Sequence, residues 1–196
     1  SNALLTVRVP SPDFFDDFDP GVDWTQWSAY GGSIQANSYG GSVSGSRSLW
    51  FGGYGSRYVT TRSLNTAGGG LIRFSLRLGD GFGLNWEQVD LPLKGVVLEG
   101  STNAGTSWSE IGSYDVPEFT VWSQIETTIP AAAQSRTTLF RWRQLANDGD
   151  CCDHWALDDV EIVLGPTPPA IIQAPADRNA GVGGTATFRV VADGAP

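Results

Sequence analysis

The chain has 196 residues and carries a formal net charge of −9, which disfavours binding to nucleic acid and to anionic membrane surfaces. No apolar run approaches the ~20 residues that span a bilayer, so we expect no membrane insertion. The 25 glycines, 11 prolines and 8 tryptophans favour strands and turns over helices, so the sequence predicts an all-β fold.

The N-terminal part combines aromatic and acidic residues. Residues 1–3 read Ser-Asn-Ala and have the form of an expression-tag remnant, so we expect the natural sequence to begin at residue 4. Residues 14–27 (FFDDFDPGVDWTQW) contain Pro20-Gly21 and a self-repelling aspartate cluster, both of which disfavour a helix. Residues 31–46 are rich in glycine and serine and are predicted to form a loop.

Regularly spaced strand patterns follow. Residues 71–78 and 138–144 alternate apolar and charged side chains, as half-buried strands do. Residues 79–93 form an irregular excursion, and residues 131–136 a turn that can hold one helical turn. Eight strands without helical crossovers predict an antiparallel β-sandwich; their ranges are 48–51, 57–62, 71–78, 95–100, 107–111, 124–129, 138–144 and 155–164.

The character of the sequence changes after residue 164. Residues 165–170 form a proline-rich linker. Residues 171–196 show an extended stretch, a glycine-rich turn and an alternating strand at 185–191, which is the pattern of the first two strands of an immunoglobulin-like domain. Because such a fragment has unpaired edges, we expect it to pack against another sheet or another chain.

The last sandwich strand contains an unexpected charge. Counting by twos places Asp158 on the same face as Ala156, Val160 and Ile162, which would be the core face. A buried carboxylate needs compensation. An arginine partner, a strand end that reaches water and a bound divalent metal are three alternatives that the segment leaves open.

Several motifs stand in a characteristic order. They are DDFDPGVDWTQW, LWFGGYGSRYVTTRSLN, STNAGTSW, FRWRQ and DHWALDDVEI. Together they resemble a reelin subrepeat, so the domain is expected to span residues 4–164. The hairpin at 101–108 also resembles an Asp-box, with Asn103 in place of the usual aspartate. The resemblance implies a jelly-roll β-sandwich, a secreted or cell-surface location and a structural Ca2+ ion.

The predicted metal ligands are Asp17, Asp19, Asp158 and Asp159. Related jelly rolls place their first and last strands side by side, and calcium takes six to eight oxygen ligands, partly from backbone carbonyls. In the alternative interpretation, the N-terminal aspartates form a solvated loop and Asp158 pairs with Arg57 or Arg141.

Other metal and thiol chemistry is less well supported. Neighbouring Cα atoms lie about 3.8 Å apart, below the usual disulfide range, so Cys151 and Cys152 are expected to be two thiols rather than a disulfide. Adjacent cysteines followed by His154 lack the usual spacing of zinc ligands. His154 is the only histidine, so most general-base schemes lack their usual residue and we expect no enzyme activity.

The predicted function is structural or adhesive. We expect the module to contact neighbouring domains of the same chain and cell-surface proteins or glycans. The alternative is a carbohydrate-binding module that uses exposed aromatic side chains; the candidates in or near loops are Trp24, Trp27, Tyr30, Tyr54, Trp86 and Trp122.

Overall fold

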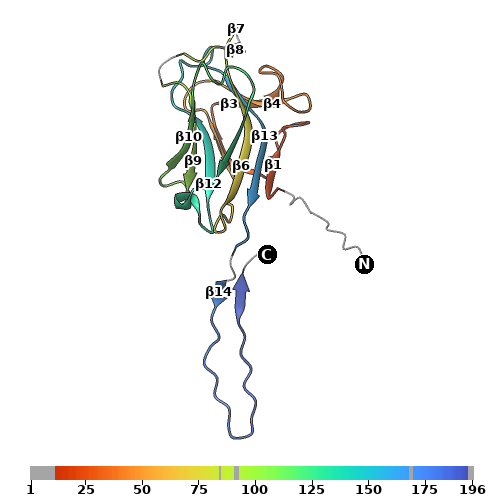
Figure 1. Ribbon diagram of the computed structural model, residues 1–196, viewed down its shortest axis with the longest axis vertical. Helices are drawn as coiled ribbons and strands as arrows, with labels where there is room; N and C mark the ends of the chain where they lie inside the picture. The colour runs from red at the N-terminus through yellow and green to blue at the C-terminus, as the bar shows by residue number, and fades with distance from the viewer. Residues whose placement is uncertain (1–11, 84, 91–92, 168–169, 194–196) are drawn as a thin grey trace, which may run out of the picture.

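A computed structural model describes residues 12–83, 85–90, 93–167 and 170–193 of the chain (Figure 1). The predicted tag remnant and most of the lead-in before residue 12 lie outside these residues, as does the end of the predicted immunoglobulin-like segment. Within the described ranges, no helix is long and apolar enough to cross a membrane.

Two antiparallel sheets face each other in a sandwich. The first sheet has the order β11 (Ser123–Thr128), β6 (Gly70–Leu78), β13 (Trp155–Leu164), β4 (Ser48–Gly52) and β3 (Ser33–Asn37). A sixth strand, β1 (Phe14–Asp16), pairs with β13 along the same edge as β4. The second sheet has the order β10 (Ser109–Tyr114), β9 (Val96–Ser101), β12 (Leu139–Gln144), β5 (Tyr58–Thr61) and β2 (Trp27–Gly31).

Short elements complete the sandwich. A hairpin of β7 (Phe82–Gly83) and β8 (Trp86–Glu87) occupies the predicted irregular excursion, and a 3-10 helix, η1 (Ala131–Ala133), occupies the predicted turn. The prediction of an all-β, antiparallel jelly-roll sandwich is therefore confirmed.

The core lies between the two sheets and is rich in aromatic rings. Phe74 on β6 and Trp142 on β12 are fully buried and pack edge to face, with ring centroids 5.3 Å apart. Trp27 on β2 packs against Trp142 from the other side, with a centroid distance of 6.0 Å. The alternating patterns of β6 and β12 predicted these core faces because each strand is apolar on one side only.

The prediction of a loop over residues 31–46 is wrong for its first half. Residues 33–37 form β3, which pairs residue by residue with β4 from Ser33↔Gly52 to Asn37↔Ser48. Only Ile34 and Ala36 of this edge strand pack against the core, so its sequence lacks a strong apolar pattern.

A β-bulge in β13 interrupts the regular alternation of side chains from which the orientation of Asp158 was predicted. Leu157 pairs with core-facing Leu76, whereas Asp158 pairs with Ser75 on the outer face; the register then shifts before Glu161. Asp159 has a φ of 48°, and the extra residue returns Val160 to the core. Asp158 therefore points away from the core, and the predicted core-facing orientation is wrong.

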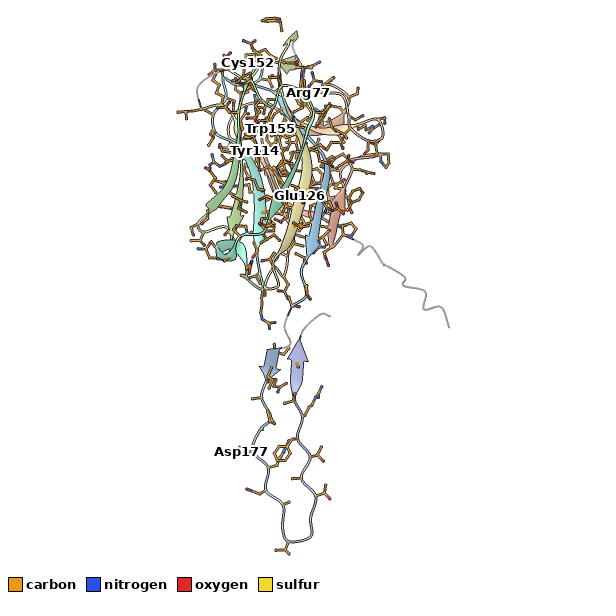
Figure 2. The ribbon with its side chains drawn as sticks, viewed as in Figure 1. Arg77, Tyr114, Glu126, Cys152, Trp155 and Asp177 are labelled. Carbon is orange, nitrogen blue, oxygen red and sulfur yellow. A yellow bond between two sulfur atoms is a disulfide. The ribbon has the colours of Figure 1, made fainter. Side chains whose placement is uncertain are left out.

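The C-terminal segment is a long hairpin that extends from the end of the sandwich (Figure 1). Its strands are β14 (Ala170–Gln173) and β15 (Val191–Asp193). The predicted strand at 185–191 is therefore wrong for residues 185–190, which form no strand, and only residue 191 of that range is paired. The side chains of residues 171–190 are exposed, and Figure 2 shows Asp177 on this hairpin, well away from the sandwich. Residues 171–190, which the structure describes, do not pack against another sheet, and the immunoglobulin-like domain stays a prediction.

Candidate functional site

Asp158 lies in a buried position beneath the loop that joins β3 and β4. Its Oδ2 accepts hydrogen bonds from the backbone N–H groups of Val43, at 2.6 Å, and Ser44, at 3.4 Å. Its Oδ1 accepts one from the N–H of Asp159, at 2.9 Å. Although the side chain is on the outer face of the sheet, this loop covers it completely. The carboxylate is thus compensated by backbone dipoles rather than by a side-chain cation.

These hydrogen bonds do not fully offset the cost of burial. Burial and, to a lesser extent, the neighbouring charge of Asp159 raise the pKa of Asp158 to about 6, against the lowering effect of its N–H donors. A carboxyl group with this pKa is still mostly ionised at neutral pH.

Two more of the predicted ligands contact the same loop. Ser44 donates its hydroxyl hydrogen to Oδ1 of Asp159. Asp19 accepts hydrogen bonds from the N–H groups of Ser46, at 3.0 Å, and Arg47, at 3.2 Å. The Ser46 N–H, followed by its hydroxyl, lowers the pKa of Asp19. Residues 43–47 therefore connect the segment after β1 with the bulge in β13.

Gly45 is required at the centre of this loop. Its φ is 54°, and a Cβ atom there would lie 2.0 Å from Oδ2 of Asp19. Any larger residue would therefore displace the Asp19 carboxylate.

Asp17 has a different role from the other three predicted ligands. Its Oδ1 accepts a hydrogen bond from the N–H of Asp19, at 3.1 Å, and so shapes the turn that follows β1. The described part of the chain contains no group of three or more His, Cys, Asp or Glu side chains close enough together to hold a metal ion. The predicted side-by-side arrangement of the first and last strands is confirmed, since β1 pairs with β13.

The neighbouring Asp16 is not one of the predicted metal ligands, but it has a clear structural role. It is buried, and it accepts hydrogen bonds from Trp27 Nε1, at 2.7 Å, and from the N–H groups of Phe18 and Asp23. Burial raises its pKa against the effect of these donors. Asp16 fixes the turn after β1, and the sequence offered only its membership of the acidic cluster as a signal.

Neither arginine proposed as a partner for Asp158 has that role. Arg141 binds Glu99 on β9 through Nε, at 2.9 Å, and Nη2, at 2.7 Å, and stacks on Trp108. Arg57 is fully buried, and its donors bind the side-chain oxygen of Gln144 and backbone carbonyl oxygens of the loops that follow β4 and β12. The arginine alternative is therefore wrong.

The loop between β12 and β13, which Arg57 contacts, contains a disulfide between Cys151 and Cys152, so the expectation of two thiols is wrong. Figure 2 shows Cys152 at the end of the sandwich farthest from the C-terminal hairpin. The carbonyl of Cys152 accepts a hydrogen bond from Arg57, at 2.8 Å. The two cysteines lie in a turn whose backbone carbonyls accept hydrogen bonds from the Arg57 guanidinium group. The spacing of the cysteines in the sequence did not indicate this support.

His154 follows this turn and is buried. Its Nδ1 accepts a hydrogen bond from the N–H of Glu87, at 2.9 Å, and its ring stacks on Trp50. Burial, followed by the charge of Arg57, lowers its pKa. The neutral imidazole thus serves as an acceptor that fixes the β7–β8 hairpin.

The hairpin between β9 and β10 shows the turn geometry that its sequence suggests. Oδ1 of Asn103 accepts hydrogen bonds from the Ser107 N–H, at 3.0 Å, and from the Ser101 hydroxyl, at 2.9 Å. Its Nδ2 donates to Ser107 Oγ, at 2.8 Å. Asn103 closes the turn through both ends of its amide, and the Asp-box interpretation stays a prediction.

The candidate aromatic residues differ widely in exposure. Trp27 is in the core, and Trp86 and Trp122 are half-buried. Tyr54 is 79% exposed, compared with 48% for Trp24 and 55% for Tyr30. Trp24 and Tyr30 pack against each other, with ring centroids 5.0 Å apart, so much of each face is already covered. Tyr54 is therefore the most accessible ring of this set.

Known structures share this fold at low sequence identity. The K1 cleaved adhesin domain of Lys-gingipain from Porphyromonas gingivalis superimposes with a TM-score of 0.54 and 13% identity, over 78% of this chain and 98% of that one. The K3 adhesin domain of the same protein gives 0.53 and 17%, over 79% and 100%. A xylan-binding domain from Paenibacillus barcinonensis gives 0.50 and 14%, over 81% and 98%.

The family assignment rests on a sequence match that covers most of the sandwich. The match extends over residues 31–163, from the last residue of β2 to the penultimate residue of β13. It includes the loop over Asp158, the Arg57 segment and the complete bulge of β13. The chain therefore belongs to the Reelin subrepeat B family.

Proposed function

We propose that the chain is a non-catalytic, calcium-stabilised binding module that acts outside the cell or at its surface. Its family membership and the adhesin domains that share its fold support an adhesive role. Its partners would be neighbouring domains of the same chain and cell-surface proteins. The observation that carries the calcium part of this proposal is the buried carboxylate of Asp158 beneath the 43–47 loop.

The residues around that loop suit a hard cation. Asp19 and Asp159 bring two further carboxylates to the loop that covers Asp158, and like-charge repulsion between Asp158 and Asp159 would fall if a cation lay near them. Calcium accepts carboxylate, hydroxyl and backbone carbonyl oxygens. Because the described acidic side chains form no cluster of three, we propose that oxygens of the loop complete the set, while Asp17 orients Asp19.

The non-catalytic part of the proposal is supported by how the reactive groups are used. His154 is neutral, buried and hydrogen-bonded to Glu87. Glu99 is held between Arg141 and Arg143, and Asp153 is buried and binds Lys94 together with two backbone N–H groups. These groups have structural partners, which leaves them poorly placed to transfer protons to a substrate.

Thermal unfolding in calcium and in chelator tests the metal site. Calcium should raise the Tm of the wild-type protein, and Asp158→Ala should remove that increase. Glu126→Ala is the matched control, because Glu126 is a carboxylate on the same sheet that pairs with Arg73 away from the loop (Figure 2). If chelator leaves the wild-type Tm unchanged, the calcium proposal is wrong.

Adhesion is tested separately from metal binding. Beads coated with the wild-type protein should bind mammalian cells or extracellular matrix above the level of beads coated with an unrelated β-sandwich protein. Retention equal to that control in both calcium and chelator would contradict the adhesive role without affecting the fold or the metal site.

Carbohydrate binding is a second candidate function. The observation that favours it is Tyr54, whose ring is 79% exposed and lines a cleft. A xylan-binding domain shares the fold, although at 14% identity that likeness concerns the fold alone.

A further inference from the structure

A cleft lies at one end of the second sheet, where β5 begins and β12 ends, between the β4–β5 turn and the loop that follows β12. Its volume is about 600 Å³, within the range of small-molecule binding sites. Tyr54, Gly55 and Ser56 form one wall, and residues 143–149 form the other. The cleft is separate from the 43–47 loop and uses none of the proposed calcium ligands.

Tyr54 provides a flat apolar surface in this cleft. Its ring lies next to Gly149, where an added Cβ would lie 3.0 Å from Cε1. The positive φ of 96° at Gly149 also favours glycine. One edge of the ring therefore rests on the opposite wall while most of the ring remains open to solvent. The C–H face of a sugar ring can stack on such a surface, and its hydroxyl groups remain free for hydrogen bonding.

The polar groups of the cleft are balanced in charge. Arg143 binds Glu99 through Nε, at 3.1 Å, and Nη2, at 2.9 Å, so its Nη1 is outside that pair. Asp148 binds Lys94 through Oδ2. One arginine and one aspartate thus line the cleft, together with backbone amides and Ser56. This lining suits a neutral ligand rich in hydroxyl groups, and the net charge of −9 further disfavours an anionic one.

The two walls are fixed to each other before any ligand binds. Nη2 of Arg57 bridges them by donating to the carbonyl oxygens of Gly53, at 2.8 Å, and Gly149. Nδ2 of Asn147 adds a second bridge to the carbonyl of Gly55, at 2.9 Å. Because these donors are satisfied within the protein, the cleft keeps its width, and binding would not incur the entropy cost of ordering two loops.

We propose that this cleft binds a neutral oligosaccharide, with one sugar ring stacked on Tyr54 and its hydroxyl groups bonded to Arg143, Asp148 and the 145–149 backbone. The proposal rests on the carbohydrate-binding candidate and names its site and ligand class. A peptide is less suitable, because β12 has neighbours on both sides and offers no free edge to an added strand.

The test is titration of isotope-labelled protein, followed by amide NMR shifts, with xylotetraose, cellotetraose and β-1,4-galactotriose as neutral probes and sialyllactose as the charged probe. At least one neutral probe should shift the amides of residues 53–56 and 145–149. Tyr54→Ala should weaken binding at least about tenfold, and Tyr54→Phe should retain it within about threefold because the stacking surface remains. Phe15→Ala, which removes an exposed ring from β1 in the opposite sheet, should bind as the wild type does.

Four results would overturn the proposal. They are the absence of shifts with every neutral probe at 20 mM, shifts confined to other surfaces, unchanged affinity of Tyr54→Ala, and tighter binding of sialyllactose than of any neutral probe. Shifts at another surface would preserve the carbohydrate-binding function and reject only this site. A Tm of Tyr54→Ala equal to that of the wild type verifies that the variant is folded.

Discussion

Asp158 should make the metal-free protein less stable as the pH rises from 4 to 6. In the folded protein its pKa is raised to about 6, whereas the ordinary value is 3.8. Below pH 3.8 the group is protonated in both states, so it costs nothing. Above pH 6 it is ionised in both states, and the folded state bears the full penalty, on the order of 3 kcal/mol for a shift of this size.

The assay compares wild type and Asp158→Asn by urea unfolding at several pH values in chelator. Asparagine cannot ionise, so the difference in the free energy of unfolding between the two proteins isolates the titration of Asp158. That difference should move in favour of the variant by on the order of 3 kcal/mol between pH 4 and pH 7. At every pH the variant should also lose about 1–2 kcal/mol, because the amide NH2 of asparagine replaces a carboxylate oxygen that accepts from the Val43 or Asp159 N–H. This constant loss does not affect the pH dependence of the difference.

Calcium should reverse this pattern if it binds at Asp158. With calcium at saturation, the wild type should become the more stable protein at pH 7, and its advantage should shrink below pH 6 as protons compete with the ion. A difference that stays flat from pH 4 to pH 7 in chelator would refute the reasoning about the buried carboxylate. A pH-dependent difference that calcium does not alter would refute only the metal site.

Three further predictions concern structural groups outside that site. Arg57→Lys should lower the free energy of unfolding by about 3 kcal/mol or more in urea, since one ammonium group cannot replace the guanidinium bonds to Gly53, Gly149 and Cys152; Arg178→Lys, at an exposed position on the C-terminal hairpin, serves as the control. His154 has a lowered pKa in the folded state, so stability should be complete above pH 6.5 and fall as the pH drops below it; His154→Asn should lack that slope, and equal slopes would contradict the assignment. Asn103→Ala should cost about 1–2 kcal/mol, whereas Asn103→Asp, which retains the acceptors, should stay within about 0.5 kcal/mol of wild type, and equal losses for both would contradict the proposed turn bonds.

The sequence predicts the sandwich well where strands have two distinct faces. On β6 four alternate apolar residues (Ile72, Phe74, Leu76 and Leu78) point inward and Arg73 and Arg77 point outward, so alternation alone locates the strand and its orientation. Edge strands carry a weaker signal. β3 was missed because only Ile34 and Ala36 pack against the core, and its hydrogen bonds to β4 rather than its side chains define it.

The candidate site was predicted in composition but not in detail. The pairing of β1 with β13 follows the arrangement of related jelly rolls, and it brings Asp19 and Asp158 to the same loop, which the sequence did not predict. The bulge at Asp159 could not be inferred from alternation. One inserted residue reverses which face of the sheet the side chains on the N-terminal side of the bulge point to, relative to a regular strand counted back from Ile162. Arg57 could not be identified as a buried residue either, because its partners are backbone carbonyls, which every sequence contains.

Two of the buried charged groups, Arg57 and Asp158, explain why different parts of this module should respond differently to solution conditions. Arg57 is a buried cation surrounded by carbonyl oxygens; burial lowers its pKa to about 10, so it remains charged at neutral pH and holds the walls of the Tyr54 cleft permanently. Asp158 is a buried anion held by N–H groups, and its pKa of about 6 is close enough to neutrality for protons or a cation to change its state. Calcium and pH should therefore act on the 43–47 loop and on global stability. The cleft should keep its geometry because its supporting charge does not titrate in the physiological range.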